Sequence, residues 1–398
     1  MSARRILLLD TGNEWGGGTN SMIELLKRID RSRFDVTCCF YKDYRKGEGG
    51  RLLSEELADL GIPLIVMPTR GQPLWAKLAK ELARGIFSWS SRLKKRAVRS
   101  IEMRWRIRQR AAMLATLLRE GGYELLYMNN QPASNLEGYL AGEIAGIPVV
   151  QHCRSQPLLH VDEVAIIERS VTRIICVSQG VADVLSAHLT AQSSLRVVHN
   201  AIDCHQQLPS PVILPGLIPD LPIVGTVGRL ASLKAVDHLL EALGALAAEG
   251  VYTNCLVVGE GEQRQALEAL AASLGIAAYV HFVGFQENPL AWVRAMDICV
   301  LCSSKEGLPR VVLEAMLAAK PVIGSDVTGT RELIVHQETG LLYAYGDVPA
   351  LTSALRRLLA NPPTCHAMGD AGRQRVEAGF SIESYVAGVT AVLDEALA

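Results

Sequence analysis

The chain has 398 residues, of which 49% are hydrophobic and 20% are charged, and its formal net charge at pH 7 is −1. This length is sufficient for two or three domains, and the composition is that of a folded globular protein, which excludes an intrinsically disordered chain. The balanced charge excludes a strongly basic protein and gives no indication of a nucleic-acid partner.

Cysteine usage and hydropathy predict a cytoplasmic protein. Nine cysteines are scattered at irregular spacing, which is typical of a reducing compartment. Arg4 and Arg5 are followed by only four apolar residues before Asp10, too few for a signal peptide. No apolar run approaches the ~20 residues of a membrane span.

In the first half of the chain, short apolar runs alternate with helical patterns. The runs predict buried strands at 3–10, 35–41, 62–67, 123–128, 147–152, 173–178 and 195–200. Strands that are separated by helices predict a parallel sheet.

Residues 84–110 interrupt this alternation. From Arg92 to Arg110 there are nine basic residues and one acidic residue, Glu102. Four apolar residues recur there at helical spacing: Leu93, Ala97, Ile101 and Trp105. A basic helix with an apolar stripe is typical of binding to an anionic membrane surface. The alternative is a solvated helix face packed on the N-terminal half.

Residues 204–222 contain five prolines and predict a linker between two halves. The alternation then restarts, with strands predicted at 222–230, 253–259, 277–284, 297–303 and 320–326. The sequence therefore predicts an α/β protein with two doubly wound parallel sheets. Ligands bind such sheets at the carboxyl ends of the strands, so the cleft between the halves is the expected site.

Two segments have features of a phosphate site. The glycine-rich segment 13–18 precedes a helix predicted at 19–29, and Gly17 and Gly18 let a ligand approach backbone N–H groups at the helix N-terminus. A plain tight turn explains the same glycines. Arg229 and Lys234 follow the first strand of the second half, where they can bind phosphate oxygens. The alternative is two solvated surface cations.

The third segment, 303–316, reads SSKEGLPRVVLEAM. Pro309 predicts the first residue of a helix, whose N-terminus near Gly307 and Leu308 can hold an anion. Glu306 precedes this helix and Glu314 lies inside its apolar run. Carboxylates at such a place suit sugar hydroxyls better than phosphate. The alternative is that Glu306 only interacts favourably with the helix dipole and that Glu314 is a surface residue. The position of Glu314 in an apolar run argues against this alternative.

Other classes of enzyme lack their motifs. Gly259-Glu-Gly261 begins a dinucleotide-binding motif, but its third glycine is replaced by Arg264. There is no G-x-S-x-G, as a serine hydrolase requires, and no two aspartates stand two positions apart to clamp a metal. Cys299 and Cys302 have metal or redox spacing, but on a strand they face opposite sides.

Segment 303–333 strongly resembles the Glu-x7-Glu signature region of the family 4 retaining glycosyltransferases of GT-B fold. VVHNAID, VGRLASLKAVDHLLEAL and the glycine-rich loop are similar to other segments of that family. The resemblance covers nearly the whole chain, and it is most specific in 222–345 and weakest in 70–120. One departure is Ala235, where the family usually has glycine after the lysine.

The resemblance implies a fold and a set of roles. It implies a GT-B fold with an acceptor-binding domain at 1–204, a donor-binding domain at 205–379 and a final helix, about 380–398, that packs back on the first domain. It also implies roles for single residues. Arg229 and Lys234 bind the donor diphosphate, which is approached by backbone amides near Gly17, Gly18, Gly307 and Leu308. Glu306 faces the transferred sugar, Glu314 hydrogen-bonds the ribose, and His152 is the active-site histidine. Taken alone, His152 would more often be a structural histidine, and it is the resemblance that reverses this interpretation.

The activity implied is a retaining transfer without metal or cofactor, from a nucleotide-diphosphate sugar to a glycan or lipid-linked acceptor of envelope or exopolysaccharide synthesis. No residue stands out as a nucleophile, so we expect front-side transfer, with the lobes closing around the donor. Two alternatives remain: a catalytically silent sugar-nucleotide-binding protein and a GT-B nucleotide-sugar epimerase. The base, the sugar, the acceptor and the linkage are not determined by these motifs.

Overall fold

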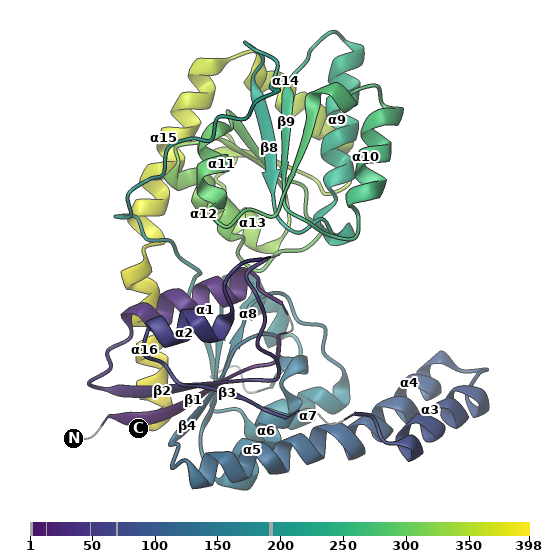
Figure 1. The fold of residues 1–398 in the computed structure, drawn as a ribbon, viewed down its shortest axis with the longest axis vertical. Helices are drawn as coiled ribbons and strands as arrows, with labels where there is room; N and C mark the ends of the chain where they lie inside the picture. Colours follow the sequence, from purple (N-terminus) through teal and green to yellow (C-terminus); the bar gives the residue numbers. More distant parts are fainter. Residues whose placement is uncertain (1–2, 13, 48, 69–70, 191–193) are drawn as a thin grey trace.

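The computed structural model describes residues 3–12, 14–47, 49–68, 71–190 and 194–398. Figure 1 shows two lobes, each built on one parallel sheet with helices on both faces. The first sheet has seven strands in the order β3-β2-β1-β4-β5-β6-β7, and the second has six in the order β10-β9-β8-β11-β12-β13. The predicted class of two doubly wound parallel sheets is confirmed.

The strands are short and their apolar side chains are mostly buried. Their bounds are β1 Arg4–Asp10, β2 Phe34–Phe40, β3 Leu64–Val66, β4 Leu125–Met128, β5 Val149–Cys153, β6 Arg173–Cys176, β7 Leu195–Val197, β8 Ile223–Val227, β9 Asn254–Val258, β10 Val280–Gly284, β11 Ile298–Leu301, β12 Val322–Ser325 and β13 Gly340–Tyr343. The sequence prediction missed only β13, a four-residue edge strand. Cys299 and Cys302 belong to different buried clusters, as their spacing on a strand predicted.

Helices and helical turns connect the strands. Their bounds are α1 Gly17–Arg28, α2 Leu53–Asp59, α3 Leu74–Ile86, α4 Ser91–Glu102, the π-helical η1 Met103–Ile107, α5 Arg108–Glu120, η2 Pro132–Ser134, α6 Leu136–Ala145, α7 Val161–Ser170, α8 Gln179–Ser186, η4 Ser232–Lys234, α9 Val236–Ala248, α10 Arg264–Ser273, η5 Ala277–Tyr279, α11 Pro289–Ala295, α12 Arg310–Leu317, α13 Thr328–Leu333, α14 Val348–Leu359, α15 Pro362–Gly379 and α16 Ile382–Leu397.

The proline-rich stretch 204–222 contains no helix or strand, as expected of a connection. After α15 the chain returns to the first lobe, where α16 contacts β5, β6 and α1. Its residues Ile382, Tyr385 and Val389 share a buried cluster with Ile6 and Leu8 of β1. The C-terminal helix therefore lies beside the first sheet (Figure 1).

The two lobes meet through specific polar contacts. Glu332 of α13 accepts hydrogen bonds from the backbone N–H groups of Gln179 and Gly180, at 2.8 and 2.7 Å, at the start of α8. Asn200 donates its Nδ2 to the carbonyl of Leu308 at 3.0 Å. These contacts hold the second lobe against the strand ends of the first.

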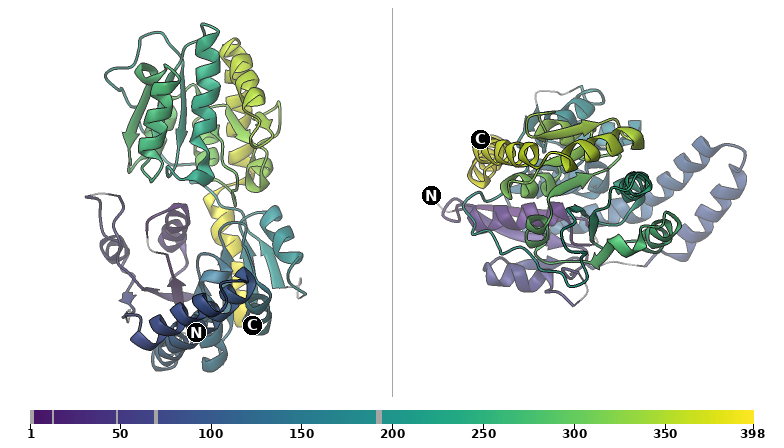
Figure 2. Two further views of the ribbon diagram at one scale, coloured as in Figure 1. Left: turned by 90° about the vertical axis from the view of Figure 1, so that its right-hand side faces the viewer. Right: turned by 90° about the horizontal axis from the view of Figure 1, so that it is seen from above.

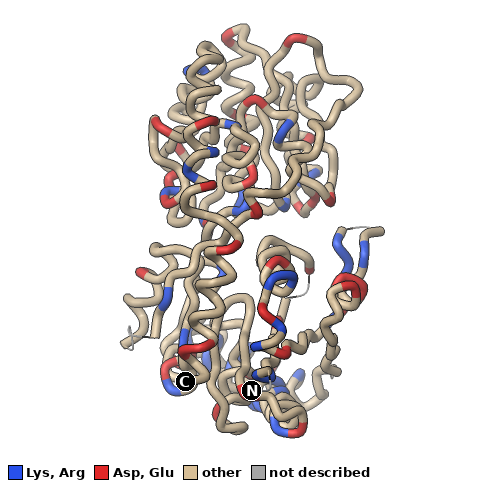
Figure 3. The backbone as a smooth tube through the Cα atoms, turned by 90° about the vertical axis from the view of Figure 1, so that its left-hand side faces the viewer, with Lys and Arg blue, Asp and Glu red and all other residues tan. Residues whose placement is uncertain are grey.

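Helices α3 and α4 form a hairpin that extends beyond the body of the first lobe (Figures 1 and 2). Elsewhere Lys and Arg are interspersed with Asp and Glu along the chain (Figure 3), in keeping with the net charge of −1. Over the described residues, none of the helices combines the length and the hydropathy needed to cross a membrane.

Candidate active site

The first strand of the second lobe ends beside an ion pair. Lys234, in the turn η4 after β8, lies 2.6 Å from Oε1 of Glu306 through its Nζ. Both side chains are largely shielded, with exposed fractions of 24% and 11%. The next residue, Ala235, has left-handed backbone angles, φ 45° and ψ 47°, which explains why glycine suits this place in the resembling family.

Arg229 contacts both lobes. Its guanidinium pairs with Glu14, from the glycine-rich loop of the first lobe, and with Glu262 at 3.3 Å. Its side chain is 54% exposed. Because both pairs are exposed, they are weak, and the guanidinium remains able to exchange them for a stronger anion such as phosphate.

The N-terminus of α12 lies where the lobes touch. Pro309 caps this helix with an extended backbone instead of being its first residue, which moves the predicted start by one residue. An added Cβ at Gly307 would lie 2.2 Å from the carbonyl oxygen of Arg154 in the first lobe. Glycine at 307 therefore permits close backbone contact between the lobes.

The N-terminus of α1 faces the same place from the other side. Gly16 caps α1 without a side-chain hydrogen bond, so its first N–H groups have no side-chain cap. An added Cβ at Gly17 would lie 3.9 Å from Cδ of Arg310, and one at Gly18 would lie 3.6 Å from Cγ of Arg154. Two helix N-termini and two arginines converge here, which favours an anion.

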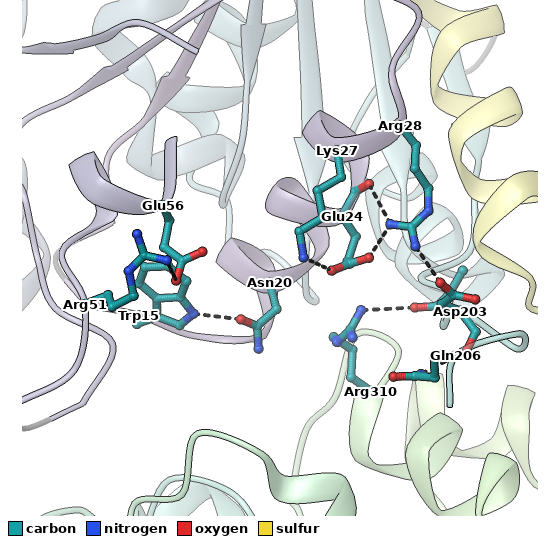
Figure 4. A network of polar contacts seen from close by, with 11 residues as sticks. Trp15, Asn20, Glu24, Lys27, Arg28, Arg51, Glu56, Asp203, Gln206 and Arg310 are labelled. Atoms are coloured by element: carbon teal, nitrogen blue, oxygen red, sulfur yellow. Dashed lines mark hydrogen bonds and ion pairs between the residues drawn. The ribbon is translucent and has the colours of Figure 1, made fainter. Parts of the chain in front are cut away.

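Figure 4 shows what holds the start of α1. Trp15 donates its Nε1 to Oδ1 of Asn20 at 2.7 Å, which ties the glycine-rich loop to the helix. Arg310 lies nearby and donates to the carbonyl of Ala201 at 3.0 Å, while its buried Nε has no hydrogen-bond partner among the described residues. Residue 13 of the predicted loop lies outside the described residues.

Glu314 lies one turn further along α12 and is half-buried. Burial raises the pKa of its carboxyl, and the charge of Arg310 opposes this rise. The structure places Glu314 on the same helix as the anion-favouring N-terminus.

His152 is fully buried on β5, two positions before Arg154. Its Nδ1 lies 2.6 Å from the hydroxyl of Tyr127, and its ring centre lies 6.2 Å from that of Tyr385. Its Nε2 is buried without a hydrogen-bond partner in the described residues. Burial, together with the charge of Arg154, holds the pKa of His152 well below its ordinary value, so the ring is neutral.

Arg154, two residues after His152, is a site residue that sequence reasoning missed. It donates to Oδ1 of Asn129 at 2.7 Å, to Oδ1 of Asn200 at 3.2 Å and to the hydroxyl of Tyr385 at 3.2 Å. Asn129 in turn donates to Asp10, whose pKa is raised by burial although this bond opposes the rise. The available signal was a set of polar residues directly after predicted strands.

Together these residues suit an anionic ligand that also carries hydroxyl groups. Arg229, Lys234 and the two helix N-termini can hold phosphate oxygens, and Glu306 can accept hydrogen bonds from hydroxyls. The two parallel-sheet lobes have the fold of a GT-B glycosyltransferase.

Solved structures share this fold. HepE from Anabaena, solved in complex with UDP and with UDP-glucose, matches with a TM-score of 0.75 and 20% identity for the UDP complex, over 98% of this chain and 99% of HepE. The lipopolysaccharide outer core galactosyltransferase WaaB matches with a TM-score of 0.69 and 17% identity, over 98% of this chain and 99% of WaaB.

Sequence comparison identifies the family. The model "Glycosyltransferase Family 4" matches residues 15–206, and the model "Glycosyl transferases group 1" matches residues 215–375. The 2-deoxystreptamine glucosyltransferase of Streptomyces kanamyceticus is 31% identical over 65% of this chain and 73% of that protein. The lipopolysaccharide core glycosyltransferase LpsE of Rhizobium meliloti is 29% identical over 54% of this chain and 62%, less than two thirds, of LpsE. The chain belongs to the family 4 glycosyltransferases and is a glycosyltransferase.

Proposed function

We propose that this protein is a retaining, metal-independent glycosyltransferase that moves a sugar from a nucleotide-diphosphate sugar to a glycan or lipid-linked acceptor. The observation that carries the proposal is the Lys234–Glu306 pair beside the N-terminus of α12, with Arg229 in contact with both lobes. A cation and a carboxylate held 2.6 Å apart suit a ligand whose phosphate and sugar hydroxyls are adjacent.

In this proposal the cations stabilise the leaving group. Arg229 and Lys234 bind the diphosphate, and backbone amides near Gly17, Gly18, Gly307 and Leu308 approach it from two helix N-termini. Donor binding exchanges the carboxylate partners of both cations, Glu14 and Glu306, for phosphate oxygens. Glu306 is then free to bond the transferred sugar, and Glu314 bonds the ribose.

In this proposal the sugar is transferred on one face, because no residue of the sequence stands out as a nucleophile. The acceptor oxygen forms the new bond to the anomeric carbon as the bond to the diphosphate breaks. The departing phosphate oxygen takes the acceptor's proton, so no protein base is needed. His152 is the active-site histidine of this proposal, near the sugar and the acceptor, and its neutral ring lies with Nδ1 2.6 Å from the hydroxyl of Tyr127.

Similar proteins support the choice of substrates. HepE was solved with UDP-glucose, which supports a nucleoside diphosphate donor. Relatives include the lipopolysaccharide core enzyme LpsE and the capsular polysaccharide glycosyltransferase CapM of Staphylococcus aureus. These names support an acceptor of cell-envelope or exopolysaccharide synthesis. In this proposal the enzyme reaches that acceptor from the cytoplasm, at an anionic membrane surface that the basic segment 92–110 contacts.

The proposal is tested by the melting temperature with UDP, GDP, ADP, CMP and dTDP, each with and without EDTA. A ligand at 100 times its dissociation constant adds about 2.7 kcal/mol to the free energy of unfolding. We expect one nucleotide to stabilise the protein, EDTA to leave that effect unchanged, and Lys234→Ala to abolish it. Lys94→Ala removes a lysine outside the cleft and should behave as the wild type.

Sugar transfer separates the alternatives. With the identified donor, Glu306→Ala should abolish transfer to acceptor extracts from envelope preparations. Donor consumption without any acceptor would support an epimerase instead. No stabilisation by any nucleotide, or stabilisation without transfer, would favour the silent binding protein.

A further inference from the structure

Helix α3 turns its large apolar side chains toward solvent. Leu74, Leu78, Leu82 and Ile86 have exposed fractions between 62% and 78%, and Trp89, in the turn that follows, is 76% exposed. The four residues of the helix form what we call the α3 stripe, together with Trp75, which is 49% exposed. Isolated exposed apolar residues are normal, but a row of them along one helix marks an interaction surface.

The opposite face of α3 carries the contacts with the rest of the protein. Its buried residues are Ala76, Lys80 and Ala83. Lys80 donates to Glu102 of α4 at 2.6 Å and lies 5.5 Å from the ring centre of Trp105. Small and charged residues therefore face the protein and large apolar ones face water, the reverse of a helix that packs on a core.

The stripe is continuous around part of the helix. At 100° per residue, Leu74, Leu78, Leu82, Trp75 and Ile86 span about 120° of the circumference. Lys77 and Arg84 lie beside this arc, together with Glu81. An apolar arc with cations on its flank is the pattern of a helix that lies in a lipid–water interface.

The hairpin is strongly basic within a nearly neutral protein. Residues 74–102 contain eight Lys and Arg and two acidic residues, Glu81 and Glu102. Five of these cations form no ion pair within the described part of the chain: Lys77, Arg92, Lys94, Lys95 and Arg96. This excess of positive charge complements an anionic surface and opposes contact with a second copy of the same hairpin.

The basic segment 92–110 does not itself supply the apolar surface. Trp105, the last residue of its apolar stripe, is buried, and Arg99 and Arg110 pair with Glu163 and Glu137. The hairpin projects from the lobe (Figures 1 and 2), so that α3 can reach a flat surface before the body does.

We propose that the α3 stripe and Trp89 insert into the interface of an anionic lipid bilayer, with the cations of α4 at the level of the headgroups. Trp residues favour this depth, and each nearby cation adds attraction to anionic lipid. The inference rests on the membrane contact of the proposed function and not on sugar transfer.

Vesicle binding without any sugar nucleotide tests the inference. The full chain is sedimented with vesicles of phosphatidylcholine containing about one third phosphatidylglycerol, and with phosphatidylcholine alone. We expect binding to the anionic vesicles that weakens as NaCl rises from about 0.05 to about 0.5 M. We expect Leu78→Ser/Leu82→Ser to lower the partition coefficient about tenfold or more. Tryptophan emission of the wild type should shift to shorter wavelength on binding.

A matched variant removes similar apolar surface elsewhere. Ile144 and Ile213 are 46% and 92% exposed, against 65% and 64% for Leu78 and Leu82. Ile144→Ser/Ile213→Ser should bind vesicles as the wild type does. Because all four side chains are exposed, both double variants should have the circular dichroism and the melting temperature of the wild type. These two measurements exclude misfolding as the cause of weaker vesicle binding.

Three outcomes would overturn the inference. If Leu78→Ser/Leu82→Ser binds anionic vesicles as the wild type does, the membrane contact stands but the α3 stripe does not make it. If the wild type binds no vesicles, the stripe and the membrane contact of the proposed function are both wrong, whereas sugar transfer is untouched. If light scattering instead shows a dimer that this variant dissociates, a second copy covers the stripe.

Discussion

His152 shows how a buried residue couples proton binding to stability. It lies on β5 with no exposed surface, and its pKa is lowered by burial and by Arg154. In the unfolded chain its ordinary pKa is 6.5. Below that pH the unfolded state binds a proton that the folded state does not, so acidification favours unfolding.

This residue yields a prediction for His152→Gln. As the pH falls below about 6.5, wild-type stability should decline more steeply than that of the variant, by up to about 1.4 kcal/mol per pH unit. Urea unfolding at several pH values between about 7.5 and 5.5 measures the difference. The exposed control His205→Gln should keep the wild-type slope. Parallel slopes for His152→Gln and the wild type would show that the buried ring is protonated in the folded protein.

At the scale of elements, the site depends on the approach of α12 to the first lobe. The backbone of Gly307 meets the carbonyl of Arg154, and an added Cβ would lie 2.2 Å from that oxygen. The start of α1 lies close to Arg310 and Arg154, but an added Cβ at Gly17 or Gly18 would make only ordinary contacts with them, at 3.9 and 3.6 Å. Glycine is therefore needed at 307, because there the backbone of one lobe meets the backbone of the other.

Gly307→Ala should therefore separate the lobes rather than unfold either one. A clash with main chain costs about 1–3 kcal/mol, which the protein can relieve by opening. We expect a larger radius of gyration in small-angle scattering and about tenfold weaker binding of the stabilising nucleotide. Gly379→Ala is the control, because its added Cβ meets nothing within 4 Å. An unchanged radius together with unchanged affinity would contradict this view of the contact.

At the scale of the whole molecule, Glu332 links α13 of the second lobe to the start of α8 in the first. Its carboxylate accepts two backbone hydrogen bonds and lies 3.5 Å from Nε2 of His199. Burial raises the pKa of this carboxyl, but hydrogen bonds from His199, Gly180 and Gln179 outweigh that and lower it below 4.5. The link is therefore complete above pH 4.5 and is lost as the pH falls through the folded pKa.

Glu332→Gln should weaken the interface between the lobes. Hydrogen bonds to a charged group contribute about 1.5–3 kcal/mol, so the variant should melt lower than the wild type at about pH 7. The gap should narrow as the pH falls through the lowered folded pKa of Glu332, because there the wild type also loses the charge. Glu338→Gln changes an exposed glutamate on the same lobe and should leave the melting temperature unchanged. A gap that stays constant throughout acidification would show that the charge is not what holds the lobes.

Much of this architecture could be predicted from the sequence because it rests on local patterns. Buried apolar runs predicted twelve of the thirteen strands, and the prolines of 204–222 predicted the connection between lobes. The apolar runs did not predict the edge strand β13, although β3 and β7, which are shorter, were predicted. The spacing of Arg229, Lys234 and Glu306 predicted residues that follow strand ends, which parallel sheets bring to one edge.

Tertiary structure decided what no local pattern encodes. The Lys234–Glu306 pair, the cross-lobe contact of Arg229 with Glu14 and the place of Arg154 depend on segments up to 215 positions apart. Which face of each element packs against the rest of the protein decides that His152 is buried beneath α16. It also decides that the α3 stripe faces outward. The sequence by itself determined the elements, the family and the chemistry of the motifs, because these follow from residue types at short spacing. Packing determined which of these side chains meet, which are sealed from water and which remain exposed.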